Sequence, residues 1–313
     1  MRAIIKKLWS IRKKNKAKIF SQIIQQSGGI TLLDLGAAGE IEPRWRSLAK
    51  HLNYIGFEAD DRSFSKLSNS KNCNSYTILN TFVWNDKRDL KFYLCEDPQV
   101  SSSFEPNKNF LNRFQNSKRF EIKKIENFYT STIDSELIKT SIDFAKLDIQ
   151  GAELSALKGM VAKLPDCLGL EIEVEFTSLY KNQPLFGDIN SFLTDQGFEF
   201  FDFTNLCRWE RSEFNPYGQC VFGDGLWLRS PEHIAKNNKN KHLKYIAICA
   251  VYGRYDLIKS LVEIMKIDLK KEYKQNLNKL VKIQKRNRRI NNFLSNFIKF
   301  ISAEDTTRSY LIY

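Results

Sequence analysis

Between residues 30 and 229 the sequence alternates short apolar segments, each the length of a β-strand, with segments of helical character. This alternation predicts an α/β sandwich with a largely parallel sheet, because parallel neighbours must be joined by crossover connections. The last two apolar segments, 198–203 and 218–229, have no long helix between them, so we expect an antiparallel strand at the end of the sheet. Residues 89–96 alternate in polarity and are expected to form a hairpin with 75–84.

The character of the chain changes outside this region, which divides it into three parts. We predict a basic N-terminal helix over residues 1–27, an α/β domain over 28–230, and a basic linker with a helical C-terminal extension over 231–313. Residues 1–20 hold apolar side chains at loose helical spacing among lysines, as a basic amphipathic helix does. Apolar residues of the extension predict a helix that packs on the core or pairs with a second copy of the chain: Ile283, Ile290, Leu294, Phe297 and Ile301.

The formal net charge is +13, which favours a nucleic acid or an anionic membrane as a partner. A compositional bias toward lysine, asparagine and isoleucine explains the charge equally well. The six cysteines form no CxxC and the three histidines do not cluster with them, so neither a zinc site nor a disulfide framework is expected. No apolar run reaches the roughly 18 residues of a membrane-spanning helix. We expect a cytoplasmic protein, with peripheral attachment to the inner face of the membrane as an open alternative.

The segment "LLDLGAAG" ends a predicted buried strand with an acid and several small residues. Gly36 and Gly39 let the backbone approach a ligand, and Ala37 takes little room. Asp34 stands near the carboxyl end of the strand, where open α/β sheets bind their ligands. A strand–turn–helix junction without a ligand would show the same pattern, so this segment alone leaves both interpretations open.

A second acid follows the next predicted strand, in "GFEADD". Glu58 lies 22 residues after Gly36, a spacing at which a carboxylate can accept hydrogen bonds from both ribose hydroxyls of a nucleotide-like ligand. Asp60 and Asp61 are alternatives for this role. The two segments together predict an adenosine-type cofactor. A full dinucleotide glycine pattern and a phosphate-binding GxxxxGK[ST] loop are both missing.

Two further segments place acids at strand ends. In "FAKLDIQGAELSALKGM", Asp148 ends an apolar strand and precedes a helix, so it either serves a ligand or caps the helix N-terminus. In "LEIEVEF", Glu171, Glu173 and Glu175 share one face of a strand because side chains alternate with period two. That face either opens into a cleft, pairs with Lys146 or an arginine, or belongs to a solvated strand near the sheet edge.

These segments, together with "SSSFEPN", "EVEFTSLYKNQPLF" and "GQCVFGDGLWL" in this order, resemble the FkbM family of S-adenosylmethionine-dependent methyltransferases. The resemblance covers roughly residues 28–230. It implies a class I methyltransferase fold with a seven-stranded, mostly parallel, Rossmann-like sheet. It also implies S-adenosylmethionine as the cofactor and transfer of its methyl group to a hydroxyl, commonly of a sugar, a glycan or a secondary metabolite.

Within this resemblance, the cofactor is expected on Asp34, Gly36, Ala37, Gly39, Glu58 and Asp60. A general base, if one is used, is Asp148 or Glu173, because His51 lies off the expected cleft. Asp148 would alternatively hold a divalent cation, and the sequence leaves this choice open. The serine-rich loop 100–107 is expected to cover a small-molecule or glycan acceptor.

Two other functions compete with this interpretation. A nucleic-acid methyltransferase would suit the positive charge, but the (D/N)PP(Y/F) stretch typical of base-amino methylation is replaced by "DIQG" at residues 148–151. A non-catalytic Rossmann-like scaffold with membrane-binding basic tails would not need buried acids at three strand ends. The first observation disfavours a nucleic-acid methyltransferase and the second disfavours a scaffold, so both favour an enzyme that methylates a hydroxyl acceptor.

Overall fold

The computed structural model describes residues 25, 27–37, 41–65, 72–211, 218–265 and 282. The predicted N-terminal helix and the apolar repeat of residues 283–301 lie outside these residues. The described residues up to Ile264 form one compact unit. Within the described part of the chain, no helix combines the length and the apolar character needed to cross a bilayer.

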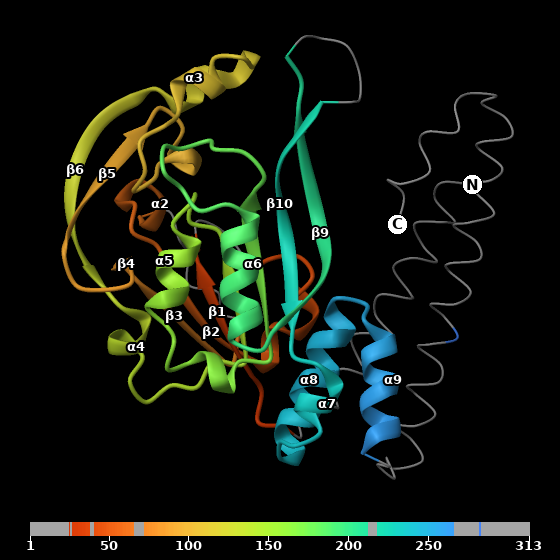
Figure 1. Ribbon diagram of the computed structural model, residues 1–313. Coiled ribbons are helices and arrows are strands. Elements are labelled where there is room, and N and C mark those ends of the chain that lie inside the picture. The colour runs from red at the N-terminus through yellow and green to blue at the C-terminus, as the bar shows by residue number, and fades with distance from the viewer. Residues whose placement is uncertain are drawn as a thin grey trace, which may run out of the picture. The chain divides into compact units, whose positions relative to one another are not determined.

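Seven strands form the main sheet in the order β3-β2-β1-β7-β8-β10-β9 (Figure 1). Their bounds are Ile30–Leu35 for β1, Leu52–Phe57 for β2, Ser75–Leu79 for β3, Phe144–Leu147 for β7, Gly169–Glu175 for β8, Glu199–Trp209 for β9 and Gln219–Leu228 for β10. Strand β10 runs antiparallel to both β8 and β9, and the other neighbours are parallel. The predicted mostly parallel sheet with an antiparallel end is confirmed.

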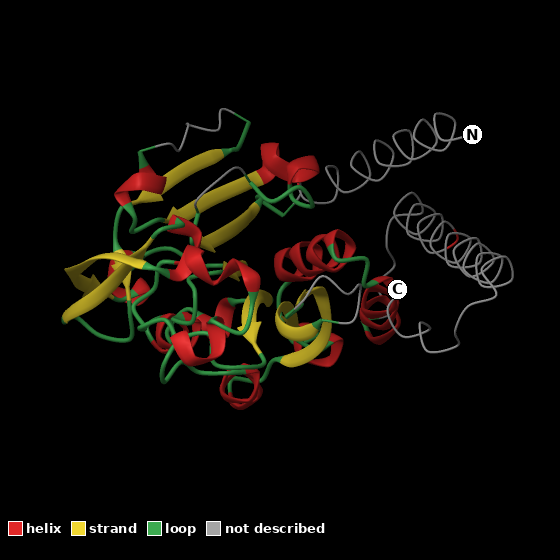
Figure 2. Cartoon of the chain, turned by 90° about the horizontal axis from the view of Figure 1, so that it is seen from above, coloured by secondary structure: helices red, strands yellow, loops and turns green. Residues whose placement is uncertain are grey.

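The two faces of the sheet carry different side chains because residues alternate along each strand. One face presents apolar residues such as Leu33, Ala145 and Ile172 to the main core, where helices α4 (Ile133–Glu136), α5 (Glu153–Lys158) and α6 (Phe186–Asp195) cover it. Short 3₁₀ turns also border the sheet: η1 (Arg46–His51) and η4 (Leu164–Asp166). Seen from above, helices flank the strands on both sides (Figure 2).

The opposite face carries the charged members of the same strands. Asp34, Lys146 and Glu171 lie side by side in the register of β1, β7 and β8, and Glu173 lies opposite Asp224 on β10. At the other end of these strands, this face is covered by aromatic rings, among which Phe144 stacks on Tyr252 at 5.1 Å between ring centroids. The charged residues therefore lie toward the carboxyl ends of the parallel strands.

A second, three-stranded sheet interrupts the chain after β3, in the order β4-β6-β5. It consists of β4 (Phe82–Val83), β5 (Asp89–Cys95) and β6 (Ile122–Ser131), with the short helices α2 (Asp61–Phe64), η2 (Pro98–Val100), α3 (Lys108–Leu111) and η3 (Gln115–Phe120) nearby in sequence. The expected hairpin of 89–96 with 75–84 is wrong. Strand β3 pairs in parallel with β2, whereas β5 pairs with β6. Alternating polarity predicted the strand but not its partner.

The chain after Ser230 folds into α7 (Pro231–Ile234), α8 (Lys239–Val251) and α9 (Tyr255–Ile264). The expected basic linker is thus largely helical, because Ser230 and Asn238 cap α7 and α8 with their side-chain oxygens. A C-terminal helical appendage is present over residues 239–264. The division of the chain at residues 27 and 230 stays a prediction.

Candidate active site

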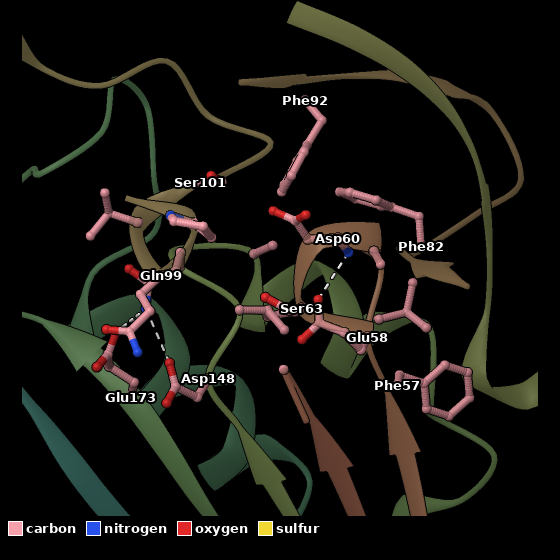
Figure 3. A pocket seen from close by; sticks show the side chains of 18 of the residues that line it. Phe57, Glu58, Asp60, Ser63, Phe82, Phe92, Gln99, Ser101, Asp148 and Glu173 are labelled. Carbon is pink, nitrogen blue, oxygen red and sulfur yellow. Dashed lines mark hydrogen bonds between the residues drawn. The ribbon is translucent and has the colours of Figure 1, made fainter. Parts of the chain in front are cut away.

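A cavity of about 390 Å³ lies where β1, β2, β7 and β8 end (Figure 3). Its wall at one end includes Glu58 and Asp60, and Asp148 and Glu173 lie together on the other side in the view of Figure 3. The three-stranded sheet and its connections supply much of the remaining wall. The cavity therefore lies where open α/β sheets bind ligands.

The turn after β1 brings two backbone segments into close contact. Gly36 has φ +81°, and a Cβ added there would lie 2.0 Å from the carbonyl oxygen of Asp148. The amides of Gly36 and Ala37 both donate to the carbonyl of Phe57, at 3.0 and 3.1 Å. Only glycine tolerates this position. Gly36 lines the cavity, Ala37 is buried beside it, and Gly39 lies outside the described residues.

The acids that follow β2 have different partners. Asp60 caps α2 through the amide of Arg62 and also pairs with its guanidinium at 2.6 Å. Asp61 accepts a hydrogen bond from Asn80 at 2.7 Å. Among the described residues, Glu58 accepts from neighbouring backbone amides alone, those of Asp60 at 2.9 Å and of Ala59. Burial raises the pKa of Glu58 to about 7. Of the two acids after β2 that line the cavity, Asp60 is ion-paired with an arginine and Glu58 is not, so Glu58 is the better acceptor for a ligand; Asp61 does not line the cavity.

Asp148 and Glu173 are joined by a residue that the sequence analysis did not single out. The side-chain amide nitrogen of Gln150 donates to Asp148 Oδ1 at 3.1 Å and to Glu173 Oε1 at 3.0 Å. Lys146 Nζ donates to the other oxygen of Asp148 at 3.1 Å. Burial raises the pKa of Glu173 well above its ordinary value, with Asp148 as a further cause. The only signal for Gln150 in the sequence was its position between Asp148 and a glycine.

The side chain of Glu153 holds the turn of residues 148–151 through hydrogen bonds to its backbone. Its Oε1 accepts hydrogen bonds from the amides of Ile149 and Gly151, at 2.8 and 3.3 Å. The side chain is 1% exposed, and burial raises its pKa to about 7. The helix that follows has no side-chain cap, so the capping interpretation does not explain Asp148, which lines the cavity instead.

Asp34 does not line the cavity but lies behind it on the charged face of the sheet. Its Oδ2 accepts a hydrogen bond from the Tyr54 hydroxyl at 2.7 Å, and its Oδ1 lies 3.9 Å from Lys146 Nζ. Burial raises the pKa of Asp34. Burial alone would lower the pKa of Lys146, but the nearby Asp148 and Asp34 raise it. Asp34 thus neighbours Lys146, which in turn contacts Asp148, and its predicted direct contact with a cofactor stays a prediction.

Glu171 pairs with an arginine, as one interpretation of "LEIEVEF" predicted. Its Oε1 lies 2.8 Å from Arg44 Nη1, and its Oε2 accepts from the Tyr252 hydroxyl at 2.8 Å. Glu175 is fully buried, and burial raises its pKa well above the ordinary value. Of the three glutamates on this face, Glu173 is the one that lines the cavity.

The serine-rich loop contributes to the wall in two ways. Ser101 lines the cavity, and its Oγ accepts from the amide of Cys95 at 3.0 Å. Ser102 is fully buried, and its Oγ donates to the backbone carbonyl of Gln150 at 2.6 Å. The loop is therefore fixed to the Asp148–Gly151 turn. No group of three or more histidine, cysteine or acidic side chains within the described ranges is arranged to hold a metal ion.

A comparison with protein families matches the sequence of this chain to one family. The family described as the methyltransferase FkbM domain matches residues 40–200, about half of the chain and the part that contains Glu58, Asp148 and Glu173. No curated protein matches the chain.

Solved structures resemble the chain with low identity. The magnesium protoporphyrin IX methyltransferase of Synechocystis PCC 6803, solved with S-adenosylmethionine bound, is 12% identical over 70% of this chain and 80% of its own, with a TM-score of 0.33. An rRNA methylase of Streptococcus thermophilus is 10% identical over 68% and 93%, also with a TM-score of 0.33. A putative RNA methyltransferase of Pyrococcus horikoshii is 11% identical over 68% and 80%, with a TM-score of 0.30.

Proposed function

This chain belongs to the FkbM family of S-adenosylmethionine-dependent methyltransferases, and we propose that it methylates a hydroxyl group of a sugar, a glycan or a secondary metabolite. The observation that supports this proposal is the Asp148–Gln150–Glu173 triplet in the cavity wall. Removing a proton from a hydroxyl calls for a nearby carboxylate, and this cavity offers two on the side away from Glu58.

The described residues fit the family's cofactor. Bound S-adenosylmethionine supplies an activated methyl group on its sulfonium sulfur. We propose that Glu58 accepts hydrogen bonds from the ribose hydroxyls, because its carboxylate lines the cavity and is only lightly engaged. The tight turn at Gly36 lines the same cavity without a side chain. Asp60 is committed to α2 and Arg62, so it has a supporting role beside Glu58.

Bound S-adenosylmethionine would supply the methyl group to the acceptor oxygen, with its sulfur as the leaving group, and in the proposed reaction the hydroxyl proton of the acceptor passes to a carboxylate of this chain. We assign the proton to Asp148, which is ion-paired with Lys146 at 3.1 Å. Burial raises the pKa of Glu173 and so favours its protonated form, which cannot act as the base; in this proposal its oxygen holds Gln150. Alignment of the acceptor with the methyl group supplies most of the rate enhancement in such a displacement.

Asp148→Asn tests this assignment because asparagine keeps the shape of the side chain but cannot take the proton. We expect methyl transfer from radiolabelled S-adenosylmethionine to fall by about 10²–10⁴-fold, with cofactor affinity within a few-fold of the wild type. Glu173→Gln is the matched variant and is expected to lose much less. Equal turnover in Asp148→Asn and wild type would eliminate Asp148 as the base.

Transfer to a set of hydroxyl-bearing sugars, to amines and to RNA oligonucleotides would test the acceptor class. Methylation of nitrogen or of RNA, without transfer to any hydroxyl of a sugar or small molecule, would contradict the proposal.

We further propose that the protein works in the cytoplasm, attached to the inner face of the membrane through its basic ends and associating with itself through its C-terminal helices. The support is the distribution of charge in the sequence: basic residues crowd residues 1–20 and 282–289 beside apolar side chains. With the exception of residue 282, these segments lie outside the described residues. A membrane-proximal acceptor would make such attachment useful.

A further inference from the structure

The cavity extends well beyond the space between Glu58 and Asp148. Its far wall contains Trp209 and Phe222 from β9 and β10, together with Arg119, Phe120 and Leu179. Strand β10 lies four strand intervals from β2 in the sheet, which at about 4.8 Å per interval is a separation of about 19 Å. The cavity thus has a far end that the proposed ribose site at Glu58 does not occupy.

The far wall is aromatic and held in place by neighbouring rings. Trp209 is half-buried and makes edge-on contacts with Phe114, Phe120 and Phe222, at 5.4, 5.9 and 6.2 Å between ring centroids. These residues belong to, or pack against, a second apolar core that also contains Leu179. Because the surrounding rings restrict its rotation, Trp209 presents a fixed surface to the cavity. A fixed aromatic surface suits the apolar side of a ring-shaped ligand.

Arg119 is the one cation among the described residues that line the cavity, where it accompanies the carboxylates of Glu58, Asp60, Asp148 and Glu173. Its guanidinium lies over the ring of Phe120, 5.5 Å from the centroid. The Nε atom is buried and has no hydrogen-bond partner, although it lies 3.5 Å from Asp97 Oδ2. Asp97 engages this side of the guanidinium in an ion pair, while the side chain is 37% exposed and offers its other N–H groups to a ligand.

More positive charge surrounds the same aromatic cluster. Arg211 lies over Phe114, 6.0 Å from the ring centroid, and Arg113 lies over Phe110 at 5.3 Å. Both side chains are exposed. Their positive field favours the approach of an anionic molecule toward this end of the cavity.

We propose that this aromatic–arginine subsite, formed by Arg119, Phe120, Leu179, Trp209 and Phe222, binds an acceptor ring that carries an acidic group. The ring packs on Trp209 and Phe222, and its carboxylate or phosphate pairs with Arg119. A hydroxyl of the ring then faces Asp148. This inference rests on the proposed methyl transfer to a hydroxyl and specifies its substrate class: an acidic sugar, either a uronic acid or a sugar phosphate.

Binding measurements on the full chain with S-adenosylhomocysteine present would test the subsite. The probes are methyl glucoside, methyl glucuronide and glucose 1-phosphate, followed by calorimetry and by tryptophan fluorescence. We expect at least one acidic probe to bind about tenfold or more tightly than methyl glucoside, as charge-assisted hydrogen bonds to arginine allow. Preference for the glucuronide or for the phosphate identifies which acidic group the subsite takes.

Arg119→Gln should abolish this preference while leaving S-adenosylhomocysteine affinity unchanged. Lys158→Gln removes an exposed charge on α5, away from the cavity, and should retain it. Trp209→Phe preserves packing and should weaken all three probes and remove most of the ligand-induced fluorescence change. An acidic preference that survives in Arg119→Gln, or equal binding of the neutral and acidic probes, would overturn the subsite.

Methyl transfer separates failure of the subsite from failure of the proposed function. If neutral hydroxyl acceptors are methylated at rates that do not depend on Arg119, the proposed subsite is wrong, but the proposed methylation of a hydroxyl is supported. Arg119-dependent binding of an RNA oligonucleotide, with no binding of the sugars, would overturn the assignment of an acidic sugar. Transfer to the glucuronide or the sugar phosphate that falls at least tenfold in Arg119→Gln would support it.

Discussion

A single side chain, that of Gln150, donates hydrogen bonds to both carboxylates of the proposed reaction centre, Asp148 and Glu173. Its backbone adopts φ +57°, a conformation that non-glycine residues adopt at a cost on the order of 1 kcal/mol or more. Local bonds hold this conformation: Ser102 donates to the Gln150 carbonyl, and the single Tyr180 hydroxyl proton is shared between the Gln150 side-chain oxygen at 3.1 Å and the Val100 carbonyl at 3.0 Å. The left-handed turn directs the amide between Asp148 and Glu173, so the strain serves the site.

Glu58 should make cofactor binding depend on pH. Its pKa is raised to about 7 by burial, so below this pH the group holds a proton and accepts ribose hydrogen bonds poorly. We expect S-adenosylmethionine affinity to rise as the pH increases from about 5.5 to 7.5, with net proton release on binding near pH 6.5. Calorimetry in two buffers of different ionisation enthalpy would measure that release.

Glu58→Gln is the control for this dependence. It should weaken binding by about 1.5–3 kcal/mol at pH 8 and flatten the pH profile. The stability of the unliganded protein should also depend on pH. A raised pKa means that the folded state holds an extra proton between about pH 4.5 and 7, so this group's contribution to stability falls as the pH rises through that window. A pH profile that Glu58→Gln leaves intact would assign the titration to another group.

At the scale of elements, the loop after β5 and the turn after β7 form one unit through Ser102. Ser102→Ala removes a buried hydroxyl that bonds to the Gln150 carbonyl and to the Phe104 amide, and should cost about 1–3 kcal/mol. For a compact unit of this size, we expect Tm to fall by about 2–10 °C. The kcat for methyl transfer should fall with it, because Gln150 loses its anchor, while cofactor affinity changes little.

Ser191→Ala, at an exposed position of α6, is the matched control and should leave both Tm and kcat unchanged. A Ser102→Ala variant with the wild-type Tm and a lowered kcat would still support the link between loop and turn. Wild-type values of both would show that the loop does not position Gln150.

Much of the sheet could be predicted from the sequence because apolar strands that end in acids are local patterns. The same patterns placed Glu58, Asp148 and Glu173 near one another. The position of Asp34 could not be predicted, because its orientation depends on Tyr54 on the neighbouring strand. The role of Gln150 could not be predicted, because no sequence pattern marks a non-glycine residue that adopts a left-handed backbone. The aromatic wall joins Phe120 to Trp209, and such long-range contacts follow only from the folded chain.

At the scale of the whole molecule, the net charge of +13 has two explanations, attachment to an anionic membrane and compositional bias. If the basic ends attach the protein to membranes, the full-length chain should co-sediment with anionic vesicles and not with neutral ones, at about 1 kcal/mol per basic residue near the surface. Higher salt and removal of residues 1–20 should each weaken binding. Full-length protein that remains in the supernatant with anionic vesicles at low salt would leave compositional bias as the explanation.

The helices after Ser230 complete the fold of the methyltransferase region. Lys241 and Lys244 lie 3.3 and 2.6 Å from the carboxylate of Asp143, whose side chain is almost fully buried. A chain that ends at residue 230 would leave this charge unpaired and uncover Phe144. We expect it to aggregate or to melt well below the full-length protein in a thermal scan. A chain that ends at residue 265 keeps Lys241, Lys244 and Tyr252 and should melt well above the shorter chain, and equal Tm for both truncations would contradict this account.

The contact between Tyr252 and the sheet also bears on how the protein is made. Tyr252 stacks on Phe144 and donates to Glu171, yet it is synthesised about a hundred residues after the first of these. While the chain is still on the ribosome, the aromatic patch around Phe144 stays open until α8 has emerged. Translation pauses before that point would prolong exposure of this patch to chaperones and to other nascent chains. The last helices therefore determine when the newly made sheet is protected.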